Sequence, residues 1–336
     1  MMKLNFNSIS AIVAGDKVFT LVKNGDILTL LSVDINLEIV NKLASFKGSN
    51  GFILKAQEEK FLINIDDKLY FAENNTWKIV LTTTKTENIF WHITEADGKV
   101  FAQEYGEPLT GIYVSENLRE WKRRVTNFDI DKQSKHFHYL TYDPYRNWLI
   151  ATLGDGCLIR AVISSDLGHS WTPLYKGPWQ FLPVVPLRDK IVFGMDSGIA
   201  RGGIGIYYPS KEKWEFIFLK WYGAFVRFAQ MADLKQLSNG IWIVALGTPQ
   251  AILISKDLKN WYPLHIKSLS ESFNYHMNVS EGKNIVVCST GNSIFVFDKD
   301  EFDNVFNMKP VMSSYKAYID RFIGIGFILK RRIATI

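Results

Sequence analysis

The histidines of this 336-residue chain are its best candidates for proton transfer near neutral pH, and four of the six fall on the face that the predicted fold would devote to function. His136 and His138 stand two residues apart in HFHYLTYDPY, so on a strand both would point to the same side. Such a pair could abstract or donate a proton. It could also bind a divalent metal together with a carboxylate such as Glu104 or Asp155. The structural alternative is that one histidine is packed and hydrogen-bonded while the other is exposed.

The remaining candidates divide by the chemistry of their side chains. The acid–base candidates besides the histidine pair are Tyr105, Tyr139, Glu104 and Asp155, and the candidate substrate contacts are Arg201, Arg227, Asp196, Trp179, Gln180 and His92. A guanidinium binds a carboxylate through two parallel hydrogen bonds, so the arginines suit an anionic ligand. Structural alternatives stand beside these roles, because Asp155 and Asp196 could brace loops and Trp179 could pack between sheets. No cofactor is expected, apart from a divalent metal at the histidine pair.

A repeat marked by tryptophan predicts how these side chains are positioned. Trp77, Trp121, Trp171, Trp214 and Trp261 follow one another at spacings of 44, 50, 43 and 47 residues, each after a short alternating strand and a polar turn. Four short strands at a period of about 45 residues are typical of a β-propeller blade. The sequence therefore predicts an all-β fold, a seven-bladed propeller of four-stranded antiparallel blades, with six or eight blades as alternatives. The predicted blades are 7–43, 50–82, 89–126, 137–175, 181–219, 227–266 and 273–307.

Propeller topology predicts that the candidates gather on one face. Loops that lead into the first strand of a blade and loops that join its second and third strands lie on the same side of the ring. All the candidates except those within strands fall in such loops, and loops held by a rigid scaffold are where function usually resides.

The C-terminal segment is expected to stand apart from the propeller. We predict one propeller domain over 1–310 and a basic, apolar tail over 311–336, acting as a closing strand or a docking segment. The stretch RFIGIGFILKRRIATI is predicted as a strand with a solvated end. The alternative is contact with an anionic membrane surface or a partner protein.

One turn carries a family resemblance. Ser164, Asp166, Gly168 and Trp171 form S-x-D-x-G-x-x-W, which resembles the Asp box of sialidase-like (BNR-repeat) propellers, and SENLREW and SKDLKNW look like degenerate copies. The resemblance implies the propeller fold and a structural role for the boxes. True sialidases need an early Arg-Ile-Pro segment, which this chain lacks, and its first arginine is Arg119. A sialidase is therefore excluded.

A second resemblance covers about residues 100–200. The order AQEYGE, HFHYLTYDPY, LGDG, the Asp box, GPWQF and FGMDSG is similar to uncharacterised BNR-type propellers and to seven-bladed lyases of uronic-acid polysaccharides. Such lyases imply histidine and tyrosine as base and acid, with arginine or histidine neutralising the uronate carboxylate. The chain departs from them after Gln180, where Phe181, Leu182 and Pro183 stand in place of a nearby arginine.

Composition and charge narrow the function classes. The net charge of +5 lies mostly in residues 311–336, whose five basic and one acidic residues give 5 − 1 = +4. The body is then nearly neutral, which argues against nucleic acid as a partner. Two distant cysteines exclude a disulfide framework, and no signal peptide or membrane span is seen, which favours a cytoplasmic location.

These observations predict a propeller that binds or cleaves an anionic glycan in the axial cleft. If the protein is an enzyme, the expected reaction is β-elimination at a uronate. The alternatives are a non-catalytic interaction propeller with a protein partner, and a glycoside hydrolase that uses paired carboxylates.

Overall fold

Antiparallel strands make up most of the described chain. The computed structural model describes residues 2–4, 6–15, 17–34, 39–57, 59–196, 202–222, 228–269 and 272–333, with side chains as far as residue 330. Short runs of β-branched and aromatic residues between turn residues favour strands throughout these segments. The all-β prediction is confirmed.

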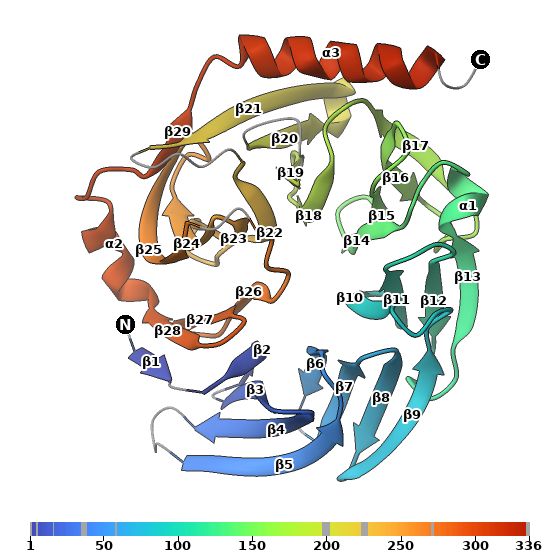
Figure 1. The fold of residues 1–336 in the computed structure, drawn as a ribbon, viewed down its shortest axis with the longest axis vertical. Helices are drawn as coiled ribbons and strands as arrows, with labels where there is room; N and C mark the ends of the chain where they lie inside the picture. The colour runs from blue at the N-terminus through green and yellow to red at the C-terminus, as the bar shows by residue number, and fades with distance from the viewer. Residues whose placement is uncertain are drawn as a thin grey trace.

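Five sheets contain four strands each. Two sheets come from the first part of the chain: β2 (Ser8–Ala14), β3 (Lys17–Asn24), β4 (Ile27–Asp34) and β5 (Ile39–Lys47), then β6 (Gly51–Gln57), β7 (Lys60–Ile65), β8 (Lys68–Glu73) and β9 (Thr76–Thr82). Two more follow: β10 (Ile89–Ala96), β11 (Lys99–Tyr105), β12 (Gly111–Ser115) and β13 (Lys122–Thr126), then β14 (Phe137–Asp143), β15 (Trp148–Leu153), β16 (Ile159–Ser164) and β17 (Thr172–Lys176). The last of the five combines β26 (Met277–Glu281), β27 (Ile285–Thr290) and β28 (Ile294–Asp298) with β1 (Met2–Leu4). Figure 1 shows the sheets arranged like blades around a common centre. In the last sheet β1 pairs with β28, so the two ends of the ring share one sheet.

The sixth sheet has nine strands. It contains β18 (Phe181–Pro186), β19 (Ile191–Met195), β20 (Gly203–Tyr208), β21 (Lys213–Trp221), β29 (Met312–Ser314), β25 (Asn260–Ser268), β24 (Gln250–Ser255), β23 (Trp242–Thr248) and β22 (Gln230–Gln236), in that spatial order. The prediction of seven separate four-stranded blades is not met here. The reason is β29, which pairs with β21 on one side and β25 on the other and so joins two runs of four strands.

The C-terminal segment differs from the prediction. Residues expected to form a strand instead form the helix α3 (Tyr318–Ile333), which lies across the outside of β21 in Figure 1. Ala317, Asp320 and Gly324 are buried at helical spacing, so one face of the segment packs on the propeller. The other helices are short: α1 (Asn127–Ile130) and α2 (Phe302–Val305) have four residues each. No helix in the described ranges is long and apolar enough to cross a membrane.

Three turns between the third and fourth strands of a sheet share one hydrogen-bond pattern. The indole nitrogens of Trp121, Trp171 and Trp261 donate to the carbonyls three residues earlier, at 3.2, 3.1 and 3.1 Å. The serine that opens each turn accepts from backbone N–H groups within it, as Ser164 does from Gly168 at 2.7 Å. These hydrogen bonds form inside each turn, so the motifs stabilise the connection between the strands.

Candidate functional site

His136 and His138 form a buried pair at the start of β14. A register shift between Phe137 and Tyr139 marks a bulge at His138, and the two imidazole rings stack with centroids 5.0 Å apart. Their Nε2 atoms are 3.1 Å apart. Each Nδ1 contacts a backbone carbonyl: His136 contacts Gly106 O at 2.7 Å, and His138 contacts Phe181 O at 3.2 Å. The expectation that both histidines point to the same side is confirmed.

The histidine pair is one proton short of a complete hydrogen-bond network. Its three contacts, two to carbonyls and one between rings, need three N–H protons, whereas two neutral imidazoles supply two. Burial lowers the pKa of His136, and burial together with the neighbouring His136 lowers the pKa of His138 to about 3. Both rings are therefore neutral near pH 7, and a proton delivered to the pair would complete the third hydrogen bond.

Gly154 makes room for the pair. A Cβ atom at this position would lie 2.3 Å from His138 Nε2 and 2.5 Å from His136 Cδ2, closer than any side chain tolerates. The Gly154 carbonyl accepts a hydrogen bond at 3.1 Å from Arg160, which is almost completely buried. The glycine of LGDG therefore serves the site through the space that it leaves, a role that sequence reasoning missed.

Tyr105, at the end of β11, lies against the histidines. Its ring centroid is 4.4 Å from that of His136 and 6.1 Å from that of His138. Burial raises the pKa of Tyr105 to about 12, and the negative charges of Asp196 and Asp155 act in the same direction. Tyr105 therefore keeps its proton at every physiological pH and can only act as a donor.

The pKa values of two aspartates beside the pair are shifted in opposite directions. Burial opposes ionisation of Asp155, but a hydrogen bond of 2.8 Å from Gln180 helps to lower its pKa overall. Burial raises the pKa of Asp196 to about 7, against a hydrogen bond of 2.6 Å from Gln230. Asp196 Oδ2 also lies 3.8 Å from His138 Nδ1. One carboxyl group is thus ionised at neutral pH while the other is partly protonated.

The raised pKa of Asp196 predicts a pH-dependent stability. Unfolded aspartate ionises near pH 3.8, whereas folded Asp196 holds its proton to about pH 7, so the folded state binds more protons in between. Stability contributed by this group is complete below the unfolded value and is lost as the pH rises to about 7. The Asp196→Asn variant has no ionisable group at this position, so it does not lose this stability as the pH rises. The free energy of unfolding of the variant minus that of wild type should therefore increase by roughly 3 kcal/mol between about pH 5 and pH 8. Urea unfolding at both pH values measures this, and an equal offset at both would contradict it.

Glu104 lies in a separate, saturated network. Its Oε1 accepts from Thr84 N, Thr84 Oγ1 and Asn88 Nδ2 at 2.8, 2.6 and 2.8 Å. Its Oε2 accepts from Gly111 N at 3.2 Å and Tyr113 OH at 3.1 Å. The side chain is completely buried. The structure therefore places Glu104 as a brace between β11, β12 and the loop before β10, and it does not bring Glu104 to the histidine pair.

Three further candidates for substrate contact lie elsewhere or outside the described residues. Trp179 is buried in the core, with its ring 5.2 Å from that of Phe218 and its indole against Gly324 of α3, so it packs and does not face the site. Arg201 and Arg227 lie outside the described residues.

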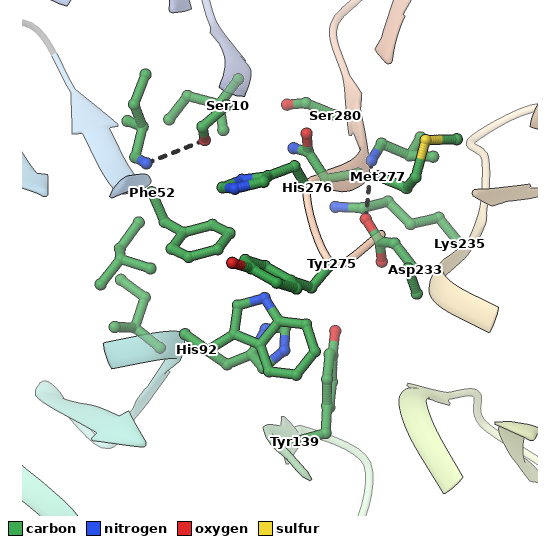
Figure 2. A pocket seen from close by; sticks show the side chains of 18 residues that line it. Ser10, Phe52, His92, Tyr139, Asp233, Lys235, Tyr275, His276, Met277 and Ser280 are labelled. Atoms are coloured by element: carbon green, nitrogen blue, oxygen red, sulfur yellow. Dashed lines mark hydrogen bonds between the residues drawn. The ribbon is translucent and has the colours of Figure 1, made fainter. Parts of the chain in front are cut away.

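His92 and Tyr139 line a second space, the axial pocket. Their rings are 4.2 Å apart, and the pocket of about 180 Å³ is enclosed by the first strands of several sheets. Figure 2 shows Phe52 and Tyr275 on one side of it and Asp233 and Lys235 on the other. Trp91 connects the pocket to the histidine pair, because its ring lies 4.7 Å from that of Tyr105 and 6.3 Å from that of Tyr275.

Two histidines of the axial pocket are neutral and incompletely paired. Burial lowers the pKa of His92 to about 3 and that of His276 to about 4. His92 Nε2 and His276 Nδ1 are buried and find no hydrogen-bond partner among the described residues. Polar atoms in this position are available to a bound molecule.

In the described part of the chain, the histidine pair finds no third metal ligand. Within the described ranges, no three His, Cys, Asp or Glu side chains come together as metal ligands. Asp155, the expected carboxylate ligand, instead accepts from Gln180. The histidine pair alone offers two ligand atoms, so no step below is derived through a metal.

Comparisons with known proteins show the fold. No family model matches the sequence, and no curated protein matches it significantly. Among solved structures, the chain resembles an oligogalacturonate lyase in complex with manganese, at 9% identity and a TM-score of 0.57 over 90% of this chain and 97% of that one. It also resembles the oligogalacturonate lyase of Vibrio parahaemolyticus, at 11% identity and a TM-score of 0.59 over 88% and 90% of the two chains.

Other solved structures widen the range of functions on this fold. YCF48 bound to D1 peptide matches at 12% identity and a TM-score of 0.57, over 89% of this chain and 96% of that one. The extracellular domain of a one-component system protein of B. thetaiotaomicron matches at 10% identity and a TM-score of 0.60, and the match spans 88% of this chain but 40% of that one. At such identities the likeness establishes the propeller arrangement alone.

Proposed function

We propose that this protein binds an anionic glycan beside the histidine pair and cleaves it by β-elimination at a uronate. One observation carries the proposal: a pair of neutral histidines, each with a ring nitrogen facing the other, lies against a tyrosine that keeps its proton. Elimination needs both, a base for the proton next to the carboxylate and an acid for the leaving oxygen. The likeness to two oligogalacturonate lyases supports the choice of a uronate.

In the proposed reaction, named side chains accept and donate every proton that is transferred. His136 or His138 takes the proton from the carbon next to the carboxylate, the electrons form a carbon–carbon double bond, and the bond to the glycosidic oxygen breaks. Tyr105 donates its proton to that oxygen, with Tyr139 as the alternative donor on the side of the axial pocket. Arg201 or Arg227 would neutralise the substrate carboxylate, and Gln180 and Asp196 would contact the sugar.

Hydrolysis is the second candidate, and the two aspartates favour it. Groups whose pKa values are driven apart are suited to act as base and acid, and Asp155 and Asp196 are such a pair. In that case Asp155 would activate water and Asp196 would protonate the leaving oxygen.

The proposal also includes the number of blades and the division of the chain into a propeller and a C-terminal segment. We count the two runs of four strands in the nine-stranded sheet as two blades, which makes seven, within one propeller domain of residues 1–310. Within residues 311–336, β29 pairs with β21 and β25 as a closing strand, and α3 is the proposed docking segment. We also propose a cytoplasmic location and a relation to Asp-box propellers.

A cleavage screen tests the function. Wild type and a His136→Ala/His138→Ala variant are incubated with uronic-acid and neutral polysaccharides, with and without a chelator, and both unsaturated-uronate absorbance and new reducing ends are recorded. We expect absorbance with a uronate polymer that disappears in the variant. Reducing ends without absorbance would replace elimination by hydrolysis, and no cleavage of any polymer would overturn the enzymatic proposal.

A further inference from the structure

The helix α3 is held against the rim of the propeller by one face. Gly324 sits so close to Trp179 that a Cβ atom there would be 2.7 Å from the indole ring. The guanidinium of Arg321 lies 5.5 Å from the centre of the Phe218 ring, and that of Arg160 lies 5.7 Å from the Phe327 ring. These contacts span more than one turn, so they fix which face of the helix points outward.

The outward face is a continuous apolar stripe. Tyr318, Phe322, Ile325 and Leu329 follow each other at spacings of four, three and four residues, which places them on one side of a helix. Phe322 is 77% exposed and Tyr318 is 72% exposed, and Ile319 and Ile323 flank them, also exposed. Large apolar side chains rarely lie together in water without a partner, so this stripe marks an interaction surface.

The exposed charged residues of the described part of the C-terminal segment are basic. Lys316, Arg321 and Lys330 are exposed in the described part of the segment, and Arg331 and Arg332 follow in the sequence. The one acidic residue, Asp320, is buried and accepts a hydrogen bond from Tyr315 OH. The surface therefore carries a positive field next to its apolar stripe.

A groove beside the helix adds a second, independent feature. It has a volume of about 330 Å³ and lies between β21 and the start of α3. Lys259, Lys316 and Arg321 line it together with Tyr315, against a single carboxylate, Glu215. Three cations converging on one groove at the edge of an apolar stripe suit the phosphate of an anionic headgroup.

We propose that α3 docks the propeller on an anionic lipid bilayer. An interfacial helix lies in the membrane plane with its apolar face in the headgroup–acyl boundary and its basic residues against anionic lipids. The stripe supplies the apolar face, the flanking cations supply the charge, and the contacts with Trp179 and Phe218 present the helix flat along its length. This surface is separate from the histidine pair, so it does not depend on the proposed reaction.

Sedimentation of the full chain with vesicles tests the docking. We expect wild type to pellet with vesicles of equal parts phosphatidylcholine and phosphatidylglycerol, and to bind phosphatidylcholine alone at least about tenfold more weakly. Phe322→Ser/Leu329→Ser should weaken binding to the mixed vesicles by about tenfold or more. Lys316→Gln/Lys330→Gln should weaken it by roughly fivefold for each charge removed.

Matched controls separate this proposal from simpler accounts. Ile39→Ser/Ile79→Ser removes two exposed apolar residues from β5 and β9, across the ring from α3, and should bind like wild type. Failure of wild type to pellet, or equal binding to both vesicle types, would overturn the proposal. A dimer in solution that dissociates in the Phe322→Ser/Leu329→Ser variant, without vesicle binding, would assign the stripe to a second copy of the chain and also overturn it.

Discussion

His138→Asn should lower kcat/KM for uronate cleavage by about 10²–10⁴-fold, the usual contribution of a general base. The reason is the proton count of the histidine pair, since with one ring replaced the remaining imidazole has no neighbouring Nε2 to share an incoming proton. His136→Asn should lower kcat/KM by about the same factor. The double variant should be little worse than either single one, because residues that act as a unit do not add. Steady-state kinetics of the three variants measure this.

The control for this prediction is His169→Asn. His169 is exposed and contacts Arg124 at the turn that precedes Trp171, far from the pair in the fold. It should keep wild-type kinetics. Wild-type rates in the His136 and His138 variants would remove the pair from the chemistry, and additive losses would show that the two rings act separately.

Glu104→Ala should destabilise the fold by about 3–5 kcal/mol, as expected when several donors lose a shared buried acceptor. The change leaves donors on Thr84, Asn88, Gly111 and Tyr113 without their shared acceptor. Each buried donor left unpaired carries a desolvation cost. Urea unfolding of the variant measures the loss.

Glu116→Ala is the matched control for Glu104. Glu116 is largely exposed and pairs with Lys99 at the surface, so its loss should leave the unfolding midpoint near that of wild type. Folded Glu104→Ala protein should retain the rate constant of wild type per active molecule. A stable Glu104→Ala protein that had lost activity would return Glu104 to the catalytic candidates.

The sequence predicted the strands, and with them which loops meet at one end of the sheets, because both follow from local periodicity. The unit predicted over 89–126 coincides with β10 to β13. His136 and Gln180 precede the first strands of their sheets, whereas Gly106 and Asp155 lie between second and third strands. His136 contacts Gly106, and Gln180 contacts Asp155. These are the two loop types that were expected to meet.

Other features depend on contacts between distant segments, which periodicity does not show. The spacing of Tyr318, Phe322, Ile325 and Leu329 is helical, but the isoleucines of this segment also suit a strand. Packing on Trp179 favours the helix. Glu104 was expected among the acid–base candidates, and only the contacts with Asn88 and Tyr113 show its place in a buried network.

The mass of the products formed in heavy-oxygen water tests the central claim most directly. Elimination breaks the glycosidic bond without adding water, so a short oligouronide cut by the wild-type protein should give one unsaturated product and no product that carries the heavy isotope from the cleavage step. Exchange at the reducing end is corrected with uncut oligouronide incubated in the same water. A saturated product pair, one member of which has gained a single heavy oxygen, would contradict the account and assign the chemistry to Asp155 and Asp196.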